Sequence, residues 1–369
     1  MITVQQIIDA IEEVAPLHLQ ESYDNAGLII GDPKQNVSQA LITLDVTEEI
    51  IDEAIEQKCD IIIAHHPIIF SGLKKLNGKN LVERCVIKAI KNDIAIYASH
   101  TNLDSVYGGV NSKIADIIGL KEQQILHPTY SPLVKVTTFI PATHQQEVID
   151  TLATMGYGKI GNYDSCSFST KGTGRFKPLQ GSTPYIGSCD KLEEVEEVRY
   201  ECLLKQSEVA SFIQALKKVH PYEEVAYDII ETKNNEITSG LGMKGTLPEP
   251  INSKEFLEKL SKLFDIPVIK HSNICHEKIQ NVAICGGAGI SFLNDAIRQK
   301  ADIFITGDVK YHDFFNAEEK IIIADIGHFE SEQFTKEVFY EILTKKIPNF
   351  AVRMSNISSN AVNYFIRES

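Results

Sequence analysis

The chain has 369 residues, of which 43% are hydrophobic and 23% are charged, and its formal net charge is −14. A chain of this length is too long to fold around one ordinary hydrophobic core, so we predict about two or three domains. The acidic balance, with no long basic stripe, argues against nucleic-acid binding, because neutralising phosphates supplies much of that affinity. No run of about eighteen apolar residues predicts a membrane span. The acidic N-terminal segment 1–16 does not resemble a secretory signal, so we expect a cytoplasmic protein.

The first third of the chain alternates predicted helices and strands. It opens with Thr3 and Gln6 at capping-box spacing, followed by apolar residues on one helical face. Thr47 is placed to cap a second helix that ends near Lys58. The other predicted elements are strands at 40–45, 60–64 and 94–98 and a helix at about 80–92. Short continuous apolar strands separated by helices are typical of a parallel sheet covered on both faces.

The last third repeats this pattern. The predicted elements are strands at 281–285, 302–306, 321–325 and 350–353 and helices at 292–299 and about 332–344. The turn GGAGIS at 286–291 follows a strand and precedes a helix, as phosphate-binding turns do. It lacks the full dinucleotide-binding pattern and the lysine of a P-loop, so we favour a tight turn over a phosphate site.

The middle of the chain follows a different pattern. Its strands alternate polar and apolar residues, as half-exposed antiparallel strands do, and two βαβ-like units of this size predict a ferredoxin-like module. The stretch 170–188 is rich in Gly, Pro, Ser and Thr and is expected to be a loop, while 126–132 and 231–240 look like linkers. The predicted organisation is an α/β domain with parallel-rich sheets over 1–127 and 234–369, interrupted by a ferredoxin-like α+β insert at 128–233.

Polar clusters directly follow three of the predicted apolar strands. They are the pair His65-His66, the segment from His100 to Asp104 and the segment from His328 to Glu332. Ligands bind outside the carboxyl ends of strands in open parallel sheets, so we expect the three clusters to converge on one crevice. A lone histidine at a strand end is more often capped or solvated than a ligand, and this explanation is the better one for His100 taken alone. The adjacent histidine pair is harder to explain without a ligand.

The side chains in these clusters are of the types that bind metal ions. Neighbouring side chains in extended backbone point to opposite sides, so His65 and His66 suit two ions or two sides of one. His328 and Glu332 share a face if a helix begins there. Imidazole and carboxylate ligands without thiolate favour Zn, Fe, Mn or Co. Two divalent ions bridged by Glu332 or Asp104 would leave a position open for water, as two-metal hydrolytic sites require.

Further residues are candidates for roles in catalysis. His100 and His312 could move protons, because an imidazole titrates near neutral pH. Lys74 and Lys75 could orient an anionic substrate, although a solvated loop is the default explanation of their segment. Asp308 could lie beside the metal site or cap a helix. The sequence contains no GxSxG elbow or other local nucleophile signature.

Seven short motifs carry a resemblance that runs nearly from end to end. They are YDNAGLIIGD (23–32), HHPIIF (65–70), HTNLD (100–104), GGVN (108–111), GLGMKG (240–245), TGDVKYHD (306–313) and GHFESE (327–332). Together they resemble the Nif-three-like dinuclear-metal family, whose members are often labelled GTP cyclohydrolase 1 type 2 homologues. The pair of HHP with a distant GHxxxE is the most specific part of the match.

The resemblance implies a two-lobed α/β domain in a toroidal homohexamer, with a two-metal site that faces an internal cavity. Carried over motif by motif, its metal ligands are His65, His66, Asp104, His328 and Glu332. The segment HPYEEVAYDI at 220–229 resembles the CutA-like or PII-like insert of the longer bacterial members. Phe329 stands where many relatives have a second histidine, which does not affect the proposed ligands.

We therefore expect a metal-dependent hydrolase that uses two divalent ions (Zn, Fe or Mn) on a small nucleotide-like or heterocyclic substrate. The cyclohydrolase label of the family is a weak guide to that substrate. One alternative is a non-catalytic metal-handling hexamer, which would release metal readily and turn over no metabolite. A second alternative is a regulatory assembly in which the PII-like insert senses a ligand.

Overall fold

The computed structural model of the chain describes residues 2–366, except for the side chains at 235, 236 and 238. It divides into two compact units. Unit 1 comprises Met1–Thr129 and Ser239–Ser369, and unit 2 comprises Tyr130–Thr238. All five predicted metal ligands lie in unit 1. Within residues 2–366, no helix is long and apolar enough to cross a membrane.

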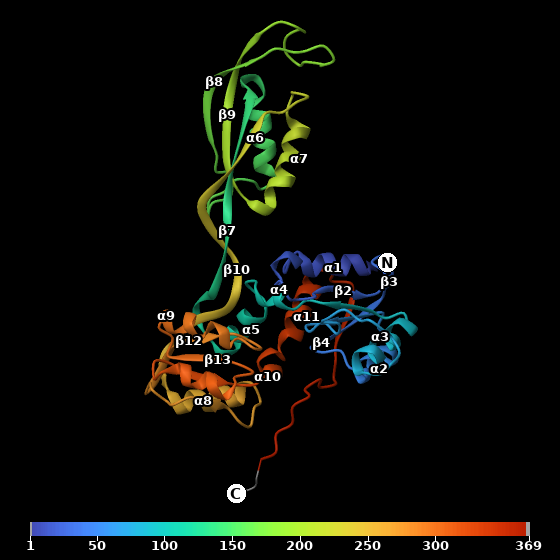
Figure 1. Cartoon of the computed structure of the whole chain (residues 1–369), viewed down its shortest axis with the longest axis vertical. Coiled ribbons are helices and arrows are strands. Elements are labelled where there is room, and N and C mark those ends of the chain that lie inside the picture. The colour runs from blue at the N-terminus through green and yellow to red at the C-terminus, as the bar shows by residue number, and fades with distance from the viewer. Residues whose placement is uncertain (1, 367–369) are drawn as a thin grey trace. The chain divides into compact units, whose positions relative to one another are not determined.

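The first lobe of unit 1 is a five-stranded sheet with helices on both faces (Figure 1). Its strands, in spatial order, are β15 (Ala351–Met354), β4 (Gln39–Thr43), β5 (Ile61–Ala64), β6 (Ala95–Ala98) and β2 (Gly27–Ile30). The first four are parallel and β2 is antiparallel to β6. The covering helices are α1 (Val4–Glu12), α2 (Glu48–Glu56), α3 (Leu81–Lys91) and α11 (Thr335–Lys346). On one face of the sheet, α2 and α3 form an apolar core that includes Ile50 and Ala89. On the other face, α1 and α11 form a core that includes Ile11 and Phe339.

Capping residues explain where three of these helices begin. Thr3 and Gln6 form the predicted capping box at the start of α1. The Thr47 side chain accepts a hydrogen bond from the Ile50 backbone N–H at the start of α2, and Asn80 caps α3 in the same way. Such caps satisfy backbone donors that the first helical turn leaves free, so local sequence determines these helix starts.

The second lobe of unit 1 contains three parallel strands and shares its core with the first lobe. Its strands, in spatial order, are β11 (Lys270–His271), β14 (Ile322–Asp325), β13 (Ile303–Thr306) and β12 (Lys278–Ile284), followed by β10 (Tyr227–Asn252) and β7 (Lys121–Pro141). The helices beside it are α5 (Val110–Ile118), α8 (Ser253–Leu263) and α9 (Leu293–Arg298). One apolar cluster includes Ile42 and Ile61 of the first lobe and Ile284 and Ile305 of the second. The predicted α/β domain with parallel-rich sheets is confirmed.

Unit 2 has the element order β-α-β-β-α-β. Between β7 and β10 lie α6 (Gln145–Thr154), β8 (Phe168–Phe176), β9 (Glu193–Lys205) and α7 (Val209–Val219). The strand order is β10-β7-β9-β8, and β9 is antiparallel to both of its neighbours. Val136, Leu152, Tyr200 and Phe212 belong to an apolar core that unit 2 forms from its own residues. The assignment of unit 2 to the ferredoxin-like fold stays a prediction.

Three sequence predictions are wrong in detail. The expected linkers at 126–132 and 231–240 lie within the long strands β7 and β10, and part of the expected loop at 170–188 forms β8. Strand pairing explains these differences, because it satisfies the backbone of segments whose composition alone indicates loops. The helix expected at about 332–344 is α11, and the short helix α10 (His328–Glu332) precedes it.

We propose that unit 2 is an inserted domain that unit 1 does not need for folding. Replacing residues 130–238 by a short Gly/Ser linker should therefore leave a folded, metal-binding unit 1, because the apolar core of unit 2 contains only its own residues. Circular dichroism, cooperative thermal unfolding and metal content would measure this. An insoluble product, or a soluble one that binds no metal, would show that the insert is integral to the fold.

Candidate metal centre

Three segments that follow strands of unit 1 bring the predicted residues together. His65 and His66 directly follow β5, and His100 precedes the short helix α4 (Thr101–Asp104) after β6. His328 is the first residue of α10, which follows β14. Because β5 and β6 belong to one lobe of unit 1 and β14 to the other, the site lies between the two lobes.

The carboxylate of Glu332 lies at the centre of the site. Its Oε2 is 3.0 Å from His66 Nε2 and 3.2 Å from His328 Nε2, and its Oε1 is 3.8 Å from His65 Nε2. Asp104 Oδ1 is 3.5 Å from His65 Nε2. Two groups of three residues result, in each of which the ligand atoms lie within 4.8 Å of one another: His66, His328 and Glu332, and His65, Asp104 and Glu332. Glu332 belongs to both of these groups, whereas Asp104 belongs to one.

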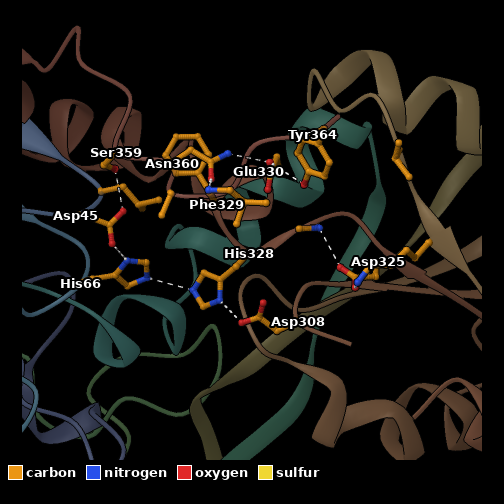
Figure 2. Close-up of a pocket in the computed structure, with 16 residues that line it drawn as sticks. Asp45, His66, Asp308, Asp325, His328, Phe329, Glu330, Ser359, Asn360 and Tyr364 are labelled. Carbon is orange, nitrogen blue, oxygen red and sulfur yellow. Dashed lines mark hydrogen bonds and ion pairs between the residues drawn. The ribbon is translucent and has the colours of Figure 1, made fainter. Parts of the chain in front are cut away.

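Each of the three histidines is oriented through its Nδ1 atom. His65 Nδ1 is 2.8 Å from the Ser99 carbonyl oxygen, and His66 Nδ1 is 2.7 Å from Asp45 Oδ1. His328 Nδ1 is 2.7 Å from Asp308 Oδ2 (Figure 2). An oxygen acceptor at Nδ1 places the proton there, which leaves the Nε2 lone pair free for a metal ion and fixes the plane of the ring.

The unsatisfied atoms at the centre fit bound cations. His65 Nε2 and Asp104 Oδ1 are buried without a hydrogen-bond partner among the described residues. The Nε2 atoms of His66 and His328 are 3.3 Å apart, and two lone pairs at this distance repel unless a proton or cation lies between them. Buried polar atoms are nearly always satisfied in folded proteins, so this donor set is suited to divalent ions.

The pKa values of these side chains reflect an excess of negative charge at the site. Burial lowers the pKa of His66, but Asp45 and Glu332 outweigh burial and raise it to about 10. The hydrogen bond with Glu332 raises the pKa of His328 to about 9, and burial raises the pKa of Asp104 to about 6. Protons therefore occupy these imidazoles when no metal does, and a metal ion has to displace them.

His100 lies beside the two groups, as the prediction of a proton-transferring role requires. Its ring centroid is 5.2 Å from that of His65 and 5.4 Å from that of His66, and these three residues form a third group with ligand atoms within 4.8 Å of one another. His100 Nδ1 is 2.8 Å from Asp24 Oδ1, which orients the ring. Thr101 also donates hydrogen bonds to Asp24. Burial raises the pKa of Asp24, but the interactions with His100 and Thr101 outweigh burial and lower this pKa to about 2.

The other predicted catalytic residues are placed differently. His312 is exposed, and its described ring contacts are with Tyr311 and Phe315 rather than with the metal-ligand candidates. Lys74 and Lys75 are exposed on the segment between β5 and α3. The roles that the sequence assigns to these three residues stay predictions, and of the two histidines only His100 contacts the site.

Two turns support the site at close range. Asp308 has a left-handed backbone with φ of +54°, and its side chain contacts His328, which decides between the two roles that the sequence left open. Gly287, in the GGAGIS turn, has φ of +62°. A Cβ at Gly287 would lie well inside contact distance of the Glu332 carboxylate, so glycine lets this carboxylate approach the backbone.

A cavity of about 540 Å³ opens beside His66 and His328 (Figure 2). The C-terminal segment lines part of it and is hydrogen-bonded to residues beside the metal-ligand candidates. Ser359 donates a hydrogen bond of 2.8 Å to Asp45 Oδ2, and the same carboxylate orients His66. Asn360 and Tyr364 donate to Glu330 Oε1 at 2.9 and 3.1 Å. A cavity of this volume is within the range of small-molecule sites.

Sequence reasoning missed Asp24, Asp45 and Ser359. Asp24 belongs to the quoted motif YDNAGLIIGD, and Asp45 ends a predicted strand, so the strand-end rule could have found it. No local signal identifies Ser359, because it is 314 residues from Asp45 in the chain.

A profile of the Duf34/NIF3 (NGG1p interacting factor 3) family matches residues 2–361. The chain belongs to the Duf34/NIF3 family. This family membership confirms the Nif-three-like resemblance of the sequence motifs.

Similar proteins in this family match over nearly their full length. A relative from Halalkalibacterium halodurans called GTP cyclohydrolase 1 type 2 homolog is 40% identical over 343 residues, which is 92% of each chain. The protein of the same name from Bacillus subtilis is 38% identical over 367 residues, covering 99% of this chain and 96% of that one. A crystal structure of a Bacillus cereus protein related to NIF3 is similar with a TM-score of 0.89 and 37% identity, covering 99% of both chains.

The contact between Ser359 and Asp45 leads to a prediction about metal affinity. Ser359→Ala removes a donor from the carboxylate that orients His66, so we expect metal affinity to fall, but by less than the roughly tenfold or greater loss that follows removal of a direct partner of a metal ligand. Competition with a chromophoric chelator would measure the affinity.

Ser358→Ala is the matched control, because this neighbour is exposed and its hydroxyl accepts a hydrogen bond from the Asn360 backbone. Ser359→Thr keeps the hydroxyl and should restore affinity. Equal affinities of the two alanine variants would contradict a role for Ser359.

Proposed function

We propose that this family member is a hydrolase that depends on two divalent ions, Zn, Fe or Mn, and acts on a small nucleotide-like or heterocyclic substrate. The observation that supports this most is the sharing of Glu332 between two groups of three candidate ligands. The adjoining cavity of about 540 Å³ could hold a substrate of this size. The name of the relatives, GTP cyclohydrolase 1 type 2 homolog, is consistent with hydrolysis of a heterocycle.

The proposed roles of the ligand residues follow from their positions. His66 and His328 would hold one ion and His65 and Asp104 the other, with Glu332 between them. Two divalent ions, when bound, supply Lewis acidity and make water a stronger nucleophile near neutral pH. No serine or cysteine nucleophile is then required. Cys285, which lies near Asp104 and Glu332, stays protonated, because burial and both carboxylates raise the pKa of its thiol.

His100 is the residue to which we assign proton transfer. Its Nδ1 is hydrogen-bonded to the Asp24 carboxylate, so Nε2 is the atom that exchanges a proton with water or substrate. The ring of Phe70 lies 6.3 Å from that of His100, and the ring of Tyr23 lies 6.3 Å from that of Phe70. Tyr23 and Phe70 are exposed, and we propose that they stack against the ring of a heterocyclic substrate.

The proposed activity can be tested with the metal-loaded full chain and a metabolite extract. We expect hydrolysis that stops on chelation and returns with added metal. His100→Ala should lower kcat by at least about tenfold at unchanged metal content, the smallest loss expected for a general base. His312→Ala tests the second predicted histidine in the same assay. If both variants keep full activity, only the metal part of the mechanism survives.

A non-catalytic role in metal handling is the second candidate function. His328 is partly exposed, with a side chain that is 35% accessible, so a metal ion held there could exchange with solvent. This function predicts metal release without turnover of any metabolite in a broad screen. We also propose, on the family resemblance, that the chain forms a homohexamer, and light scattering on the purified protein would test this. Cytoplasmic location likewise stays a prediction.

A further inference from the structure

Unit 2 contains a cavity of about 780 Å³, which is larger than the one beside the metal-ligand candidates. All of its lining residues lie between Phe139 and Ala226, so unit 2 forms it without any residue of unit 1. The volume is within the range of small-molecule sites. The proposed hydrolytic chemistry gives this cavity no role.

The sheet of unit 2 supplies the floor of the cavity. Side chains alternate along β9, and Val198 and Tyr200 face the core that α6 and α7 complete. Glu197 and Arg199 therefore point to the opposite, open face of the sheet. Phe139 of β7 lies on that open face too, because its neighbour Ile140 is in the core. The cavity is thus on the face away from α6 and α7.

The Glu197 carboxylate has a fixed position at the floor of the cavity. Tyr222 donates a hydrogen bond of 3.0 Å to Glu197 Oε1, and the Tyr222 ring lies 5.7 Å from that of Phe176 in an edge-to-face arrangement. Gly174 faces Glu197 across the strand pair, and a Cβ there would collide with the Glu197 carboxylate. The second oxygen, Oε2, accepts no hydrogen bond from the described side chains.

The loop between β8 and β9 closes the cavity. The Thr183 backbone N–H donates a hydrogen bond of 2.9 Å to Glu223 Oε1, which ties the loop to the segment before β10. Tyr185 Oη lies 3.3 Å from His144 Nε2, and the two rings are in edge-to-face contact. Pro184 and Tyr185 of this loop line the cavity.

Four basic and three acidic residues line the cavity, and the basic ones are paired outside the lining or directed away from it. Arg175, Arg199 and Lys177 are paired with Glu194, Glu201 and Asp190, respectively, so their positive charges are neutralised by residues outside the lining. Lys171 is opposite Val198 in the strand register, so its side chain points to the core side of the sheet rather than into the cavity. Glu197 and Glu223 accept hydrogen bonds from neutral donors, which leave their negative charge in place. A ligand with positive charge or several N–H donors complements such a lining.

We propose that unit 2 holds a second small-molecule site, which takes a planar aromatic or heteroaromatic ligand carrying amino or amidine groups. The N–H donors of the ligand bind Glu197, and its ring packs against Phe176 and Tyr222. Aromatic faces attract a cationic ring as well as burying its apolar surface, so both parts of the site favour the same ligand.

Benzamidine and benzoate test this proposal on the full-length chain. They share one ring but carry an amidinium and a carboxylate, respectively. Calorimetry and saturation-transfer NMR should show benzamidine binding and at least about tenfold weaker binding of benzoate. Glu197→Gln keeps the shape of the side chain and should weaken benzamidine binding by about tenfold. Tyr222→Phe, which removes the hydrogen bond to Glu197, should weaken it to a smaller extent.

Two control variants locate the binding. Glu147→Gln changes an exposed carboxylate of α6, which lies on the other face of the sheet and outside the lining, so it should leave binding unchanged. Glu332→Gln changes the metal-ligand candidates and should also leave it unchanged. Absence of benzamidine binding, equal binding of benzoate, or full binding by Glu197→Gln would each overturn the proposal. Loss of binding in Glu332→Gln alone would assign the compound to the metal site instead and would also overturn it.

Discussion

Glu332→Gln is expected to abolish binding of both metal ions while leaving the fold intact. Glu332 is the one residue that both groups of candidate ligands share. The amide keeps the size of the side chain but removes its negative charge, so affinity should fall by more than about a hundredfold at both positions. Glu332 is buried but does not belong to the apolar core, so circular dichroism should not change.

Elemental analysis of a series of variants distinguishes two ions from one. Asp104→Asn affects only the group with His65 and should retain about one ion per chain, compared with about two in the unmodified protein. Glu337→Gln is the control, because this carboxylate is half-exposed on α11 and paired with Lys113. If Glu332→Gln retained two ions, the proposed bridging role would be wrong. If the unmodified protein bound none after loading with Zn or Mn, the proposed function itself would fail.

Gly287→Ala is expected to lower both the stability of unit 1 and its affinity for metal. The backbone at Gly287 has φ of +62°, which costs a residue with a side chain about 1–2 kcal/mol of unfolding free energy. The added methyl group also meets the Glu332 carboxylate, which then has to leave its position between the other ligand candidates. A ligand displaced in this way should lower metal affinity by at least about tenfold.

Gly108→Ala separates these two effects. Gly108 has φ of +77°, but a Cβ there would meet no atom within 4 Å. This variant should therefore lose a similar amount of stability in denaturant titration and bind metal normally. Gly72→Ala, with neither a positive φ nor a close neighbour, should change neither quantity. Equal metal affinities of Gly287→Ala and Gly108→Ala would show that the approach of Glu332 to this turn does not matter for binding.

The candidate ligands were accessible from the sequence because parallel sheets impose a simple rule. Polar residues after the short apolar strands β5, β6 and β14 had to lie at the carboxyl ends of those strands, and the structure brings all of them to one site. His312 shows the limit of the rule. It is near a strand end in the sequence, but its side chain is exposed and contacts Tyr311 and Phe315. Proximity along the chain does not determine the direction of a side chain in a turn.

Local sequence by itself determined many of the helices and strands of unit 1 and pointed to the candidate ligands. Capping residues such as Thr3 and Thr47 and the continuous apolar strands act over a few residues, so their effect can be read directly. Only the tertiary structure decided that Glu332 is shared by both groups, that Ser359 supports Asp45 across 314 residues, and that β7 and β10 continue through segments with the composition of linkers. These features depend on contacts between residues far apart in the chain, and no local pattern of composition or spacing encodes such contacts.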